Sequence, residues 1–157
     1  MEVLQVEFGN FDSRADLAAQ RRLFSLCFPE NKGSEVEGED HYQWKFHAGP
    51  GSPQSHEFKA TADGKLLGYY AAIPYRYNVD GHRMIAGMVC DVMTHPESRG
   101  QGIFTRIGAH ATAELESRGL NFVTGYPIRP EVLPGHLKVG WKAAFKLPLY
   151  AQVLRLD

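Results

Sequence analysis

Apolar residues repeat with two different periods along this chain, and the period predicts the type of element. Recurrence every three or four residues predicts helices over 15–28, 39–47, 103–117 and 131–139. Pro29 ends the first helix, because proline cannot continue the helical hydrogen-bond ladder. In the last helix, Pro134-Gly135 is expected to interrupt a weak pattern.

Alternating runs and short continuous apolar runs predict strands over 3–8, 55–61, 65–73, 75–79, 82–88, 88–94, 121–125, 141–145 and 149–156. Asp63-Gly64 and Asp80-Gly81 are typical hairpin turns, so the strands that they join are expected to pair antiparallel. Pro74 predicts a bulge or a bend between two of these strands. Gly9-Asn10 is expected to end the first strand, and Asp12 or Ser13 to cap the helix that follows.

The order of the elements predicts the fold class. A helix connects strand 88–94 to strand 121–125, and such a connection makes the two strands parallel. The chain is therefore expected to form an α/β fold of the α+β type. Its mixed sheet is mostly antiparallel, with one central parallel pair, and is flanked by helices. The sequence contains no repeat or clear linker, which favours a single domain over 1–157.

A glycine turn, Arg99-Gly100-Gln101-Gly102, joins strand 88–94 to the helix that begins at Ile103. The first backbone N–H groups of a helix lack internal partners, and the helix dipole adds partial positive charge there. Glycine tolerates positive φ and lets a ligand lie against bare backbone. The turn therefore predicts an anion site, with a pyrophosphate as its expected ligand.

Composition and charge narrow the classes of function. A formal net charge of −1 without a basic run argues against binding to nucleic acid or to a membrane surface, and no apolar run is long enough to span a bilayer. Cys27 and Cys90 are too few and too far apart for a disulfide framework, so a cytoplasmic location is expected. His110 and Glu114 do not complete a zinc motif, and no metal site is predicted.

The glycine turn and its surroundings resemble the GNAT superfamily of acyl-CoA-dependent N-acyltransferases. The segment from Arg99 to Phe104 is similar to the superfamily signature, and Thr94-His95-Pro96 precedes it. The order of elements and the segment Leu137-Lys138-Val139-Gly140-Trp141 also match. More narrowly, three segments resemble a bacterial branch grouped with the enhanced-intracellular-survival type acetyltransferases: Trp44-Lys45 before a Gly-Pro-Gly loop, residues 91–96, and Gly125-Tyr126-Pro127.

The sequence departs from these patterns at two places. Phe104 stands where the signature has glycine or alanine, although backbone donors still suit a phosphate. Ile128 and Arg129 follow the Gly-Tyr-Pro segment, where the narrower branch often has asparagine.

The resemblance implies an acetyl-CoA-dependent N-acetyltransferase that acts on a primary amine of a small molecule, such as an amino sugar or an amino acid. Acetyl-CoA is then the co-substrate, no metal takes part, and a homodimer is compatible with the sequence. Backbone groups of one strand would bind the pantetheine arm, and those of the glycine turn would bind the pyrophosphate. The implied cofactor-binding residues are Val92, Met93, Thr94, Arg99, Gly100, Gln101, Gly102, Ile103 and Phe104.

Two residues are candidates for proton transfer. Asp91 is a carboxylate in an apolar strand, where burial raises the pKa of such a group toward the range of a general base. Alternatively, it accepts hydrogen bonds from nearby backbone or from His95. His136 stands four residues before Gly140, where the superfamily often has a tyrosine that acts as the acid. Alternatively, it is an exposed helix residue.

Other polar and aromatic residues are weaker candidates. Tyr126 is a third candidate acid, although packing is an equally simple role. Cys90 is expected to alternate away from Asp91 and to be a buried, inert thiol. Aromatic residues that could line an acceptor pocket, but that are more typical of a core, are Trp44, Phe46, Tyr69, Tyr70, Tyr75 and Tyr77.

Two rival functions remain open at this point. The chain could be a catalytically silent module that binds acyl-CoA and serves regulation, in which case the turn is kept and a dedicated base is missing. It could also be one half of a longer, tandem acetyltransferase. Acceptor, acyl length and oligomeric state are not encoded in any motif of the sequence.

Overall fold

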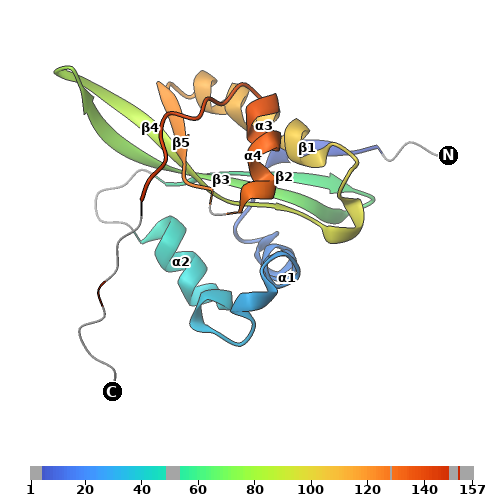
Figure 1. The fold of residues 1–157 in the computed structure, drawn as a ribbon. Helices are drawn as coiled ribbons and strands as arrows, with labels where there is room; N and C mark the ends of the chain where they lie inside the picture. The colour runs from blue at the N-terminus through green and yellow to red at the C-terminus, as the bar shows by residue number, and fades with distance from the viewer. Residues whose placement is uncertain (1–4, 49–53, 128, 149–151, 153–157) are drawn as a thin grey trace.

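A five-stranded sheet runs through the molecule in the order β1-β2-β3-β4-β5 (Figure 1). The structure is a computed structural model that describes residues 5–48, 54–127, 129–148 and 152. The strands are β1 (Glu7–Asn10), β2 (His56–Ala62), β3 (Lys65–Val79), β4 (His82–Thr94) and β5 (Phe122–Gly125). Neighbours from β1 to β4 pair antiparallel, and β5 pairs parallel to β4. The predicted mixed sheet with one parallel pair is confirmed, but the pair lies at the edge of the described sheet and not at its centre.

Helices cover both faces of this sheet. They are α1 (Leu17–Cys27), α2 (Glu39–His47), α3 (Ile103–Ser117) and α4 (Leu133–Lys138). Figure 1 shows α1 and α2 on one face and α3 and α4 on the other. Short 3₁₀ turns lie at Pro29–Asn31, Glu35–Glu37, Pro96–Ser98 and Pro130–Val132. Within the described ranges, no helix has the length and apolar character needed to cross a membrane.

Each face of the sheet has its own apolar core, because successive strand residues point to opposite sides. Tyr70 packs with the α3 residues, whereas the adjacent Tyr69 packs with those of α1 and α2. On α3 the buried apolar side chains recur every four positions, which gives one continuous apolar stripe. They are Ile103, Ile107, Ala111 and Leu115. The two cores fix α1 and α3 on opposite sides of β4, and the end of β4 lies between them.

Several predicted strand boundaries were wrong. β3 runs unbroken from Lys65 to Val79 through Pro74, which pairs in register with Gly87. Pro74 is tolerated because β2 pairs with β3 only as far as Ala72, so proline withholds no bond from β2. β1 begins later than predicted and includes Gly9 and Asn10. Residues 1–4 lie outside the described residues.

Two predictions near the carboxyl end of the chain also failed, namely the strand 141–145 and the break at Pro134-Gly135. Residues 141–145 form no strand, because Trp141 instead packs over Gly125 and the ring of His136. The predicted strand 149–156 lies outside the described residues except for Gln152. Pro134-Gly135 does not break the fourth helix, since Pro134 sits in its first turn, where proline is accommodated.

The cap of α1 also differs from the prediction. The helix begins at Leu17, and Asp16 is its N-cap. Asp12 instead accepts hydrogen bonds from the backbone N–H groups of Arg14 and Ala15 at 2.8 and 3.2 Å, which form a turn before the helix.

Candidate active site

At one edge of the described sheet, β5 accompanies only the first half of β4. Their pairing runs from Ala86 opposite Phe122 to Val89 opposite Gly125, where β5 ends. β4 continues to Thr94 without β5 beside it. Trp141 covers the end of β5, since a Cβ on Gly125 would lie 2.9 Å from its ring. The separation leaves the second half of β4 as one wall of a cleft.

A β-bulge lies in this half of β4. Tyr69 pairs with Met93 and Ala71 with Cys90, so Tyr70 faces two residues, Asp91 and Val92. Asp91 adopts a positive φ of 49°, which is uncommon for a residue other than glycine. The bulge interrupts the ladder and re-aims the side chains around it. The sequence predicted a bulge or a bend at Pro74, but the register is regular there and the bulge between β3 and β4 lies at Tyr70.

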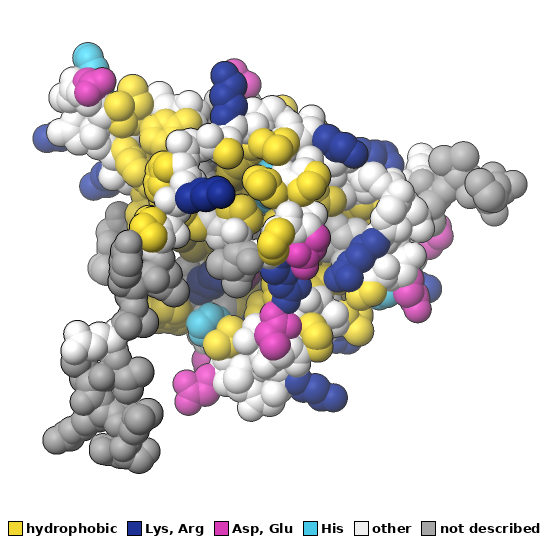
Figure 2. All heavy atoms as spheres, viewed as in Figure 1, with side chains coloured by type: hydrophobic (Ala, Val, Ile, Leu, Met, Phe, Trp, Pro, Cys, Tyr) yellow, Lys and Arg dark blue, Asp and Glu magenta, His cyan; other side chains and the backbone are white. Residues whose placement is uncertain are grey.

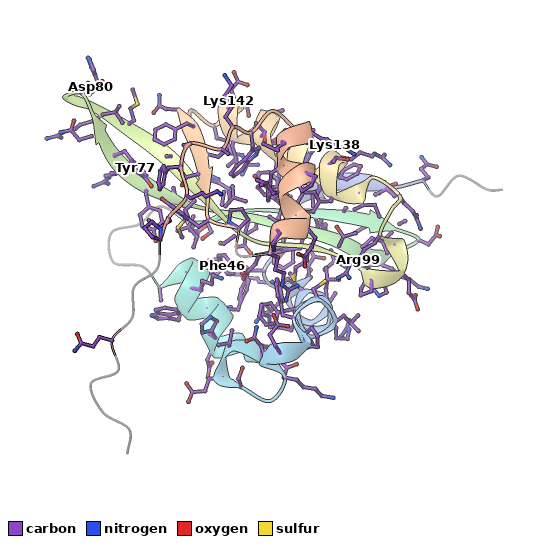
Figure 3. All side chains as sticks on the ribbon, viewed as in Figure 1. Phe46, Tyr77, Asp80, Arg99, Lys138 and Lys142 are labelled. Carbon is purple, nitrogen blue, oxygen red and sulfur yellow. The ribbon has the colours of Figure 1, made fainter. Side chains whose placement is uncertain are left out.

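A first cavity of about 560 Å³ lies between the end of β4, the glycine turn, α1 and α4. Its basic side chains are Arg99, Arg129 and Lys138, against one carboxylate, Glu131. Figure 3 labels Arg99 in the turn that leads into α3 and Lys138 on α4, and Figure 2 shows basic side chains between α4 and α1. The residues from the sequence prediction that line it are Val92, Met93, Thr94, Arg99, Gly100, Gly102, Ile103 and Phe104. Gln101 is exposed and does not line it.

The glycine turn has the backbone geometry that the sequence predicted. Gly100 and Gly102 have φ values of 78° and 74°, which only glycine adopts without strain. Gly102 is the N-cap of α3 and provides no side chain to the free N–H groups of the first turn. No atom lies within 4 Å of a Cβ built on Gly100, so the backbone there is open. Open N–H groups beside Arg99 and Lys138 suit a ligand with phosphate groups.

A second cavity, also about 560 Å³, adjoins the first along the cleft. Its polar side chains are Glu30, Asn31, Lys45, Asp91, Arg129 and His136, and its aromatic ones are Phe24, Phe28, Phe104, Tyr126 and Trp141. The residues shared by the two cavities are Phe28, Val92, Phe104, Arg129 and Val132. The bulge at Asp91 and Val92 therefore lies where the cavities meet.

Asp91 is not a free carboxylate. Lys45 of α2 reaches it across the cleft, with Nζ 2.7 Å from Oδ1. Both side chains are largely buried, at 25% and 14% exposure. The expected partner of Asp91 was a backbone group or His95, and the observed partner is Lys45. Nothing in a single sequence connects these residues, which are 46 positions apart.

His136 is buried rather than exposed, at 8% of its accessible surface. Its ring packs edge-on against Phe104, with 5.0 Å between the ring centroids, and is tilted against Trp141, with 4.6 Å between the centroids. Burial lowers the pKa of His136 from 6.5, because the charged imidazolium is poorly solvated there. The ring is consequently neutral at pH 7 and suited to accept a proton.

Phe104 fits its unusual position because Gly135 leaves room for it. A Cβ on Gly135 would lie 2.5 Å from the Phe104 ring. The aromatic residue at the start of α3 and the glycine in α4 therefore complement each other. The ring forms part of the wall between the two cavities.

Arg129 closes the cleft from the side of α1. Its Nη1 donates to the carbonyl oxygen of Cys27 at 3.0 Å, and its Nη2 donates to Glu30. The guanidinium also lies 4.8 Å from the centre of the Phe28 ring. Arg129 was noted in the sequence only as a departure from a pattern, and its role in the cleft was missed. The neighbouring Ile128 lies outside the described residues.

The remaining candidates divide between the core and the surface. Cys90 lines the second cavity together with Asp91, because the bulge breaks the alternation expected there; burial raises the pKa of its thiol to about 12, which leaves it inert. Trp44 and Tyr75 are exposed. Tyr77 packs against Phe122. Figure 3 labels Phe46 on α2, where it belongs to the core with Tyr69. Of the six aromatic residues singled out in the sequence, none lines the second cavity.

Across the described ranges, no cluster of three or more histidine, cysteine, aspartate or glutamate side chains could hold a metal ion. Lys45 and Arg129 instead provide the positive charge of the second cavity.

Comparison with known proteins identifies the family. The model of the acetyltransferase (GNAT) domain matches residues 13–144. The chain therefore belongs to the GNAT acetyltransferase family, and it is an N-acetyltransferase that uses acetyl-CoA as co-substrate. No curated protein sequence matches it.

Solved structures share the fold at low identity. A transcriptional regulator from Bacillus halodurans has a TM-score of 0.74 at 18% identity, covering 94% of this chain and 100% of its own. A predicted acetyltransferase from Clostridium acetobutylicum, solved with acetyl-CoA, has 0.72 at 16%, covering 93% and 96%. An aminoglycoside acetyltransferase from an uncultured soil metagenomic sample, in complex with sisomicin, has 0.71 at 15%, covering 98% and 97%.

Proposed function

We propose that this chain, as one domain over 1–157, transfers the acetyl group of acetyl-CoA to a primary amine of a small molecule. The first cavity binds coenzyme A, and the second cavity binds the acceptor. One observation carries this assignment: β4 and β5 separate after Val89 and Gly125, and two cavities meet at the bulge in the open half of β4. A thioester carbonyl at that junction would lie within reach of an amine in the second cavity.

In the first cavity, the backbone N–H groups around Gly100 and Gly102 bind the pyrophosphate. Arg99 and Lys138 add charge-assisted contacts. The pantetheine arm follows residues 92–94 and pairs with the backbone as an added strand would. Because the bulge frees one residue of β4 from the ladder, a backbone N–H near Val92 can donate to the thioester carbonyl.

In the second cavity, Asp91 and His136 take up the proton that the amine of the acceptor must lose. The ammonium of the acceptor must lose a proton before its nitrogen can attack the carbonyl carbon. His136 is neutral at pH 7, since burial lowers its pKa, and this supports proton acceptance rather than the acid role expected from its sequence position. Asp91 binds the ammonium when Lys45 releases it and then acts as a general base that takes a proton from it. Positioning of both substrates supplies a further part of the acceleration.

The acceptor class follows from the charges of the second cavity. Its carboxylates, Asp91 and Glu30, are each engaged by a basic residue of the chain, Lys45 and Arg129. One ammonium can compete for Asp91, whereas a polycation would find few further carboxylates. A small monoamine, such as an amino sugar or an amino acid, therefore suits the cavity best. Lys45 belongs to the segment that resembles the enhanced-intracellular-survival type branch, and we assign the chain to this branch on that resemblance.

A two-stage experiment tests the proposal. Thermal unfolding is measured first with acetyl-CoA, which must raise the Tm by mass action if the native state binds it. Release of the CoA thiol is then followed with a panel of small amines. No stabilisation at millimolar acetyl-CoA would contradict the role of the first cavity. Stabilisation without thiol release above the rate of hydrolysis, for any amine, would contradict the transfer reaction.

The second result would favour the other candidate function, a silent acyl-CoA-binding module. One observation supports it: Asp91 is held by Lys45 at 2.7 Å and is not free to act as a base. In that case acetyl-CoA binds to the first cavity, and Asp91→Ala and His136→Ala leave its binding unchanged.

A further inference from the structure

The second cavity already contains an amine of the chain itself. Lys45 extends from α2, and its Nζ lies 2.7 Å from Asp91 Oδ1, next to Val92, where the two cavities meet. The same nitrogen lies 5.3 Å from the centre of the Phe46 ring, which helps to hold it in place. Its side chain keeps 25% of its exposure and lines the cavity, so it is not sealed in the core.

We propose that Lys45 is a self-acetylation site, acetylated by the acetyl-CoA bound in its own chain. The inference rests on the proposed function, since it requires acetyl-CoA in the first cavity with its thioester at the junction. Lys45 holds its ammonium on the carboxylate that an acceptor amine would otherwise use. It therefore stands in for the acceptor when no acceptor is bound.

The reaction is the same transfer with Lys45 as nucleophile. The ammonium gives one proton to the Asp91 carboxylate, which passes it to solvent. The free Nζ then attacks the thioester carbonyl, a C–N bond forms, and the C–S bond breaks. The second proton of the nitrogen goes to the departing sulfur, so the products are an acetamide on Lys45 and the CoA thiol. No oxidant or metal is required.

Acetylation would change the cavity in a defined way. An acetamide has no charge, so the ion pair with Asp91 is lost and the carboxylate becomes available to the ammonium of an acceptor. The modification thus converts a cavity blocked by its own lysine into one that accepts a second amine.

The chain offers a matched control in Lys59. Its Nζ lies 2.6 Å from Asp16 Oδ2, and the two side chains have 28% and 20% exposure, close to those of the Lys45–Asp91 pair. Lys59 lines neither the first nor the second cavity. Chemical acetylation by free acetyl-CoA treats similar lysines alike, whereas delivery from the bound donor favours Lys45. Lys138 is a second control, because it lines the first cavity but not the second.

The full chain is incubated with acetyl-CoA and no acceptor, and peptide mass spectrometry follows the acetylation of each lysine over time. We expect Lys45 to react at least about tenfold faster than Lys59 and Lys138, because the donor is held next to it. Excess CoA, a competitor for the first cavity, should remove this advantage. Lys45→Arg keeps a positive charge beside Asp91 but provides no acylable amine, and it should abolish the dominant product.

Three outcomes would overturn the inference. Stabilisation by acetyl-CoA with equal rates at Lys45 and Lys59 would refute self-acetylation and leave the proposed function standing. Preferential labelling of Lys138 would place the thioester away from the bulge and refute it as well. Absence of stabilisation by acetyl-CoA would refute both this inference and the proposed function.

Discussion

The two cavities of the cleft have the same volume, but one is formed mainly by exposed backbone and the other by side chains. The first cavity is formed around open backbone at Gly100 and Gly102, and its charged side chains are mostly basic. The second is formed by side chains from distant segments, which engage one another in ion pairs and ring contacts. Backbone donors can bind the same phosphate group whatever the surrounding side chains are. Side chains from several elements make the second cavity specific to this chain.

The largest expected effect comes from a substitution in the second cavity that lowers the rate of acetyl transfer but not the binding of acetyl-CoA. Asn tolerates the positive φ of residue 91, so Asp91→Asn is expected to keep the fold. It should lower kcat/KM by about 10²–10⁴, the range of a general base, with little change in acetyl-CoA binding. Steady-state thiol release and a thermal shift titration measure the two quantities. Asp16→Asn, in the matched Lys59–Asp16 pair, should change neither. A parallel loss of donor binding in Asp91→Asn would show that the cavities are not separable.

The next effect concerns the first cavity alone. Gly102→Val places a β-branched side chain at a φ of 74°, beside the backbone N–H groups that are proposed to bind the pyrophosphate. Acetyl-CoA should bind about 10–100-fold more weakly, since a hydrogen bond to a charged group contributes about 1.5–3 kcal/mol. Gly119→Val carries similar strain at a φ of 83°, away from both cavities. It should destabilise the fold to a similar degree and leave calorimetric acetyl-CoA affinity unchanged. Equal weakening in both variants would attribute the effect to folding.

The wall between the cavities can be tested by a double-mutant cycle. Gly135→Ala should lower the free energy of unfolding by about 1–3 kcal/mol, because its Cβ would overlap the Phe104 ring at 2.5 Å. In a Phe104→Ala background, Gly135→Ala should instead raise it by about 0.5–1 kcal/mol, since alanine favours a helix over glycine. Urea unfolding of the four proteins gives the coupling. The same sign in both backgrounds would exclude the ring contact as the reason for glycine at 135.

The smallest expected effect is on the pH dependence of stability, which measures how far the second cavity shields His136 from water. Burial lowers the pKa of His136 in the native state below its unfolded value of 6.5, so the unfolded chain binds more protons just below pH 6.5. The stabilising contribution is complete above pH 6.5 and is lost as the pH falls through the lowered pKa. The free energy of unfolding of the wild type should therefore fall more steeply below pH 6.5 than that of His136→Gln. Equal slopes would mean that water reaches the ring. His56→Gln is the matched control. Burial and then the charge of Arg118 also lower the pKa of His56, but this residue lies outside the cleft.

The difference between the cavities also explains how much could be predicted from the sequence. The glycine turn and the helix after it are local features, and Ile103–Ser117 was predicted residue for residue. The contacts of the second cavity join residues far apart, such as Lys45 with Asp91 and Arg129 with Cys27. A pattern of apolar residues has no information about such pairs. Trp141 was predicted to lie in a strand for a similar reason. Its apolar ring covers Gly125, which is distant in the sequence, and the apolar pattern could not distinguish this contact from a strand.

One consequence of the Phe104 ring concerns binding order. The ring belongs to the walls of both cavities and rests on Gly135 and His136. A donor that displaces the ring necessarily reshapes the surface that an acceptor meets. The two affinities are then linked by a single coupling free energy, and each ligand changes the affinity for the other by the same factor. Phe104, which departs from the family signature, would in this way couple the binding of the donor to the binding of the acceptor.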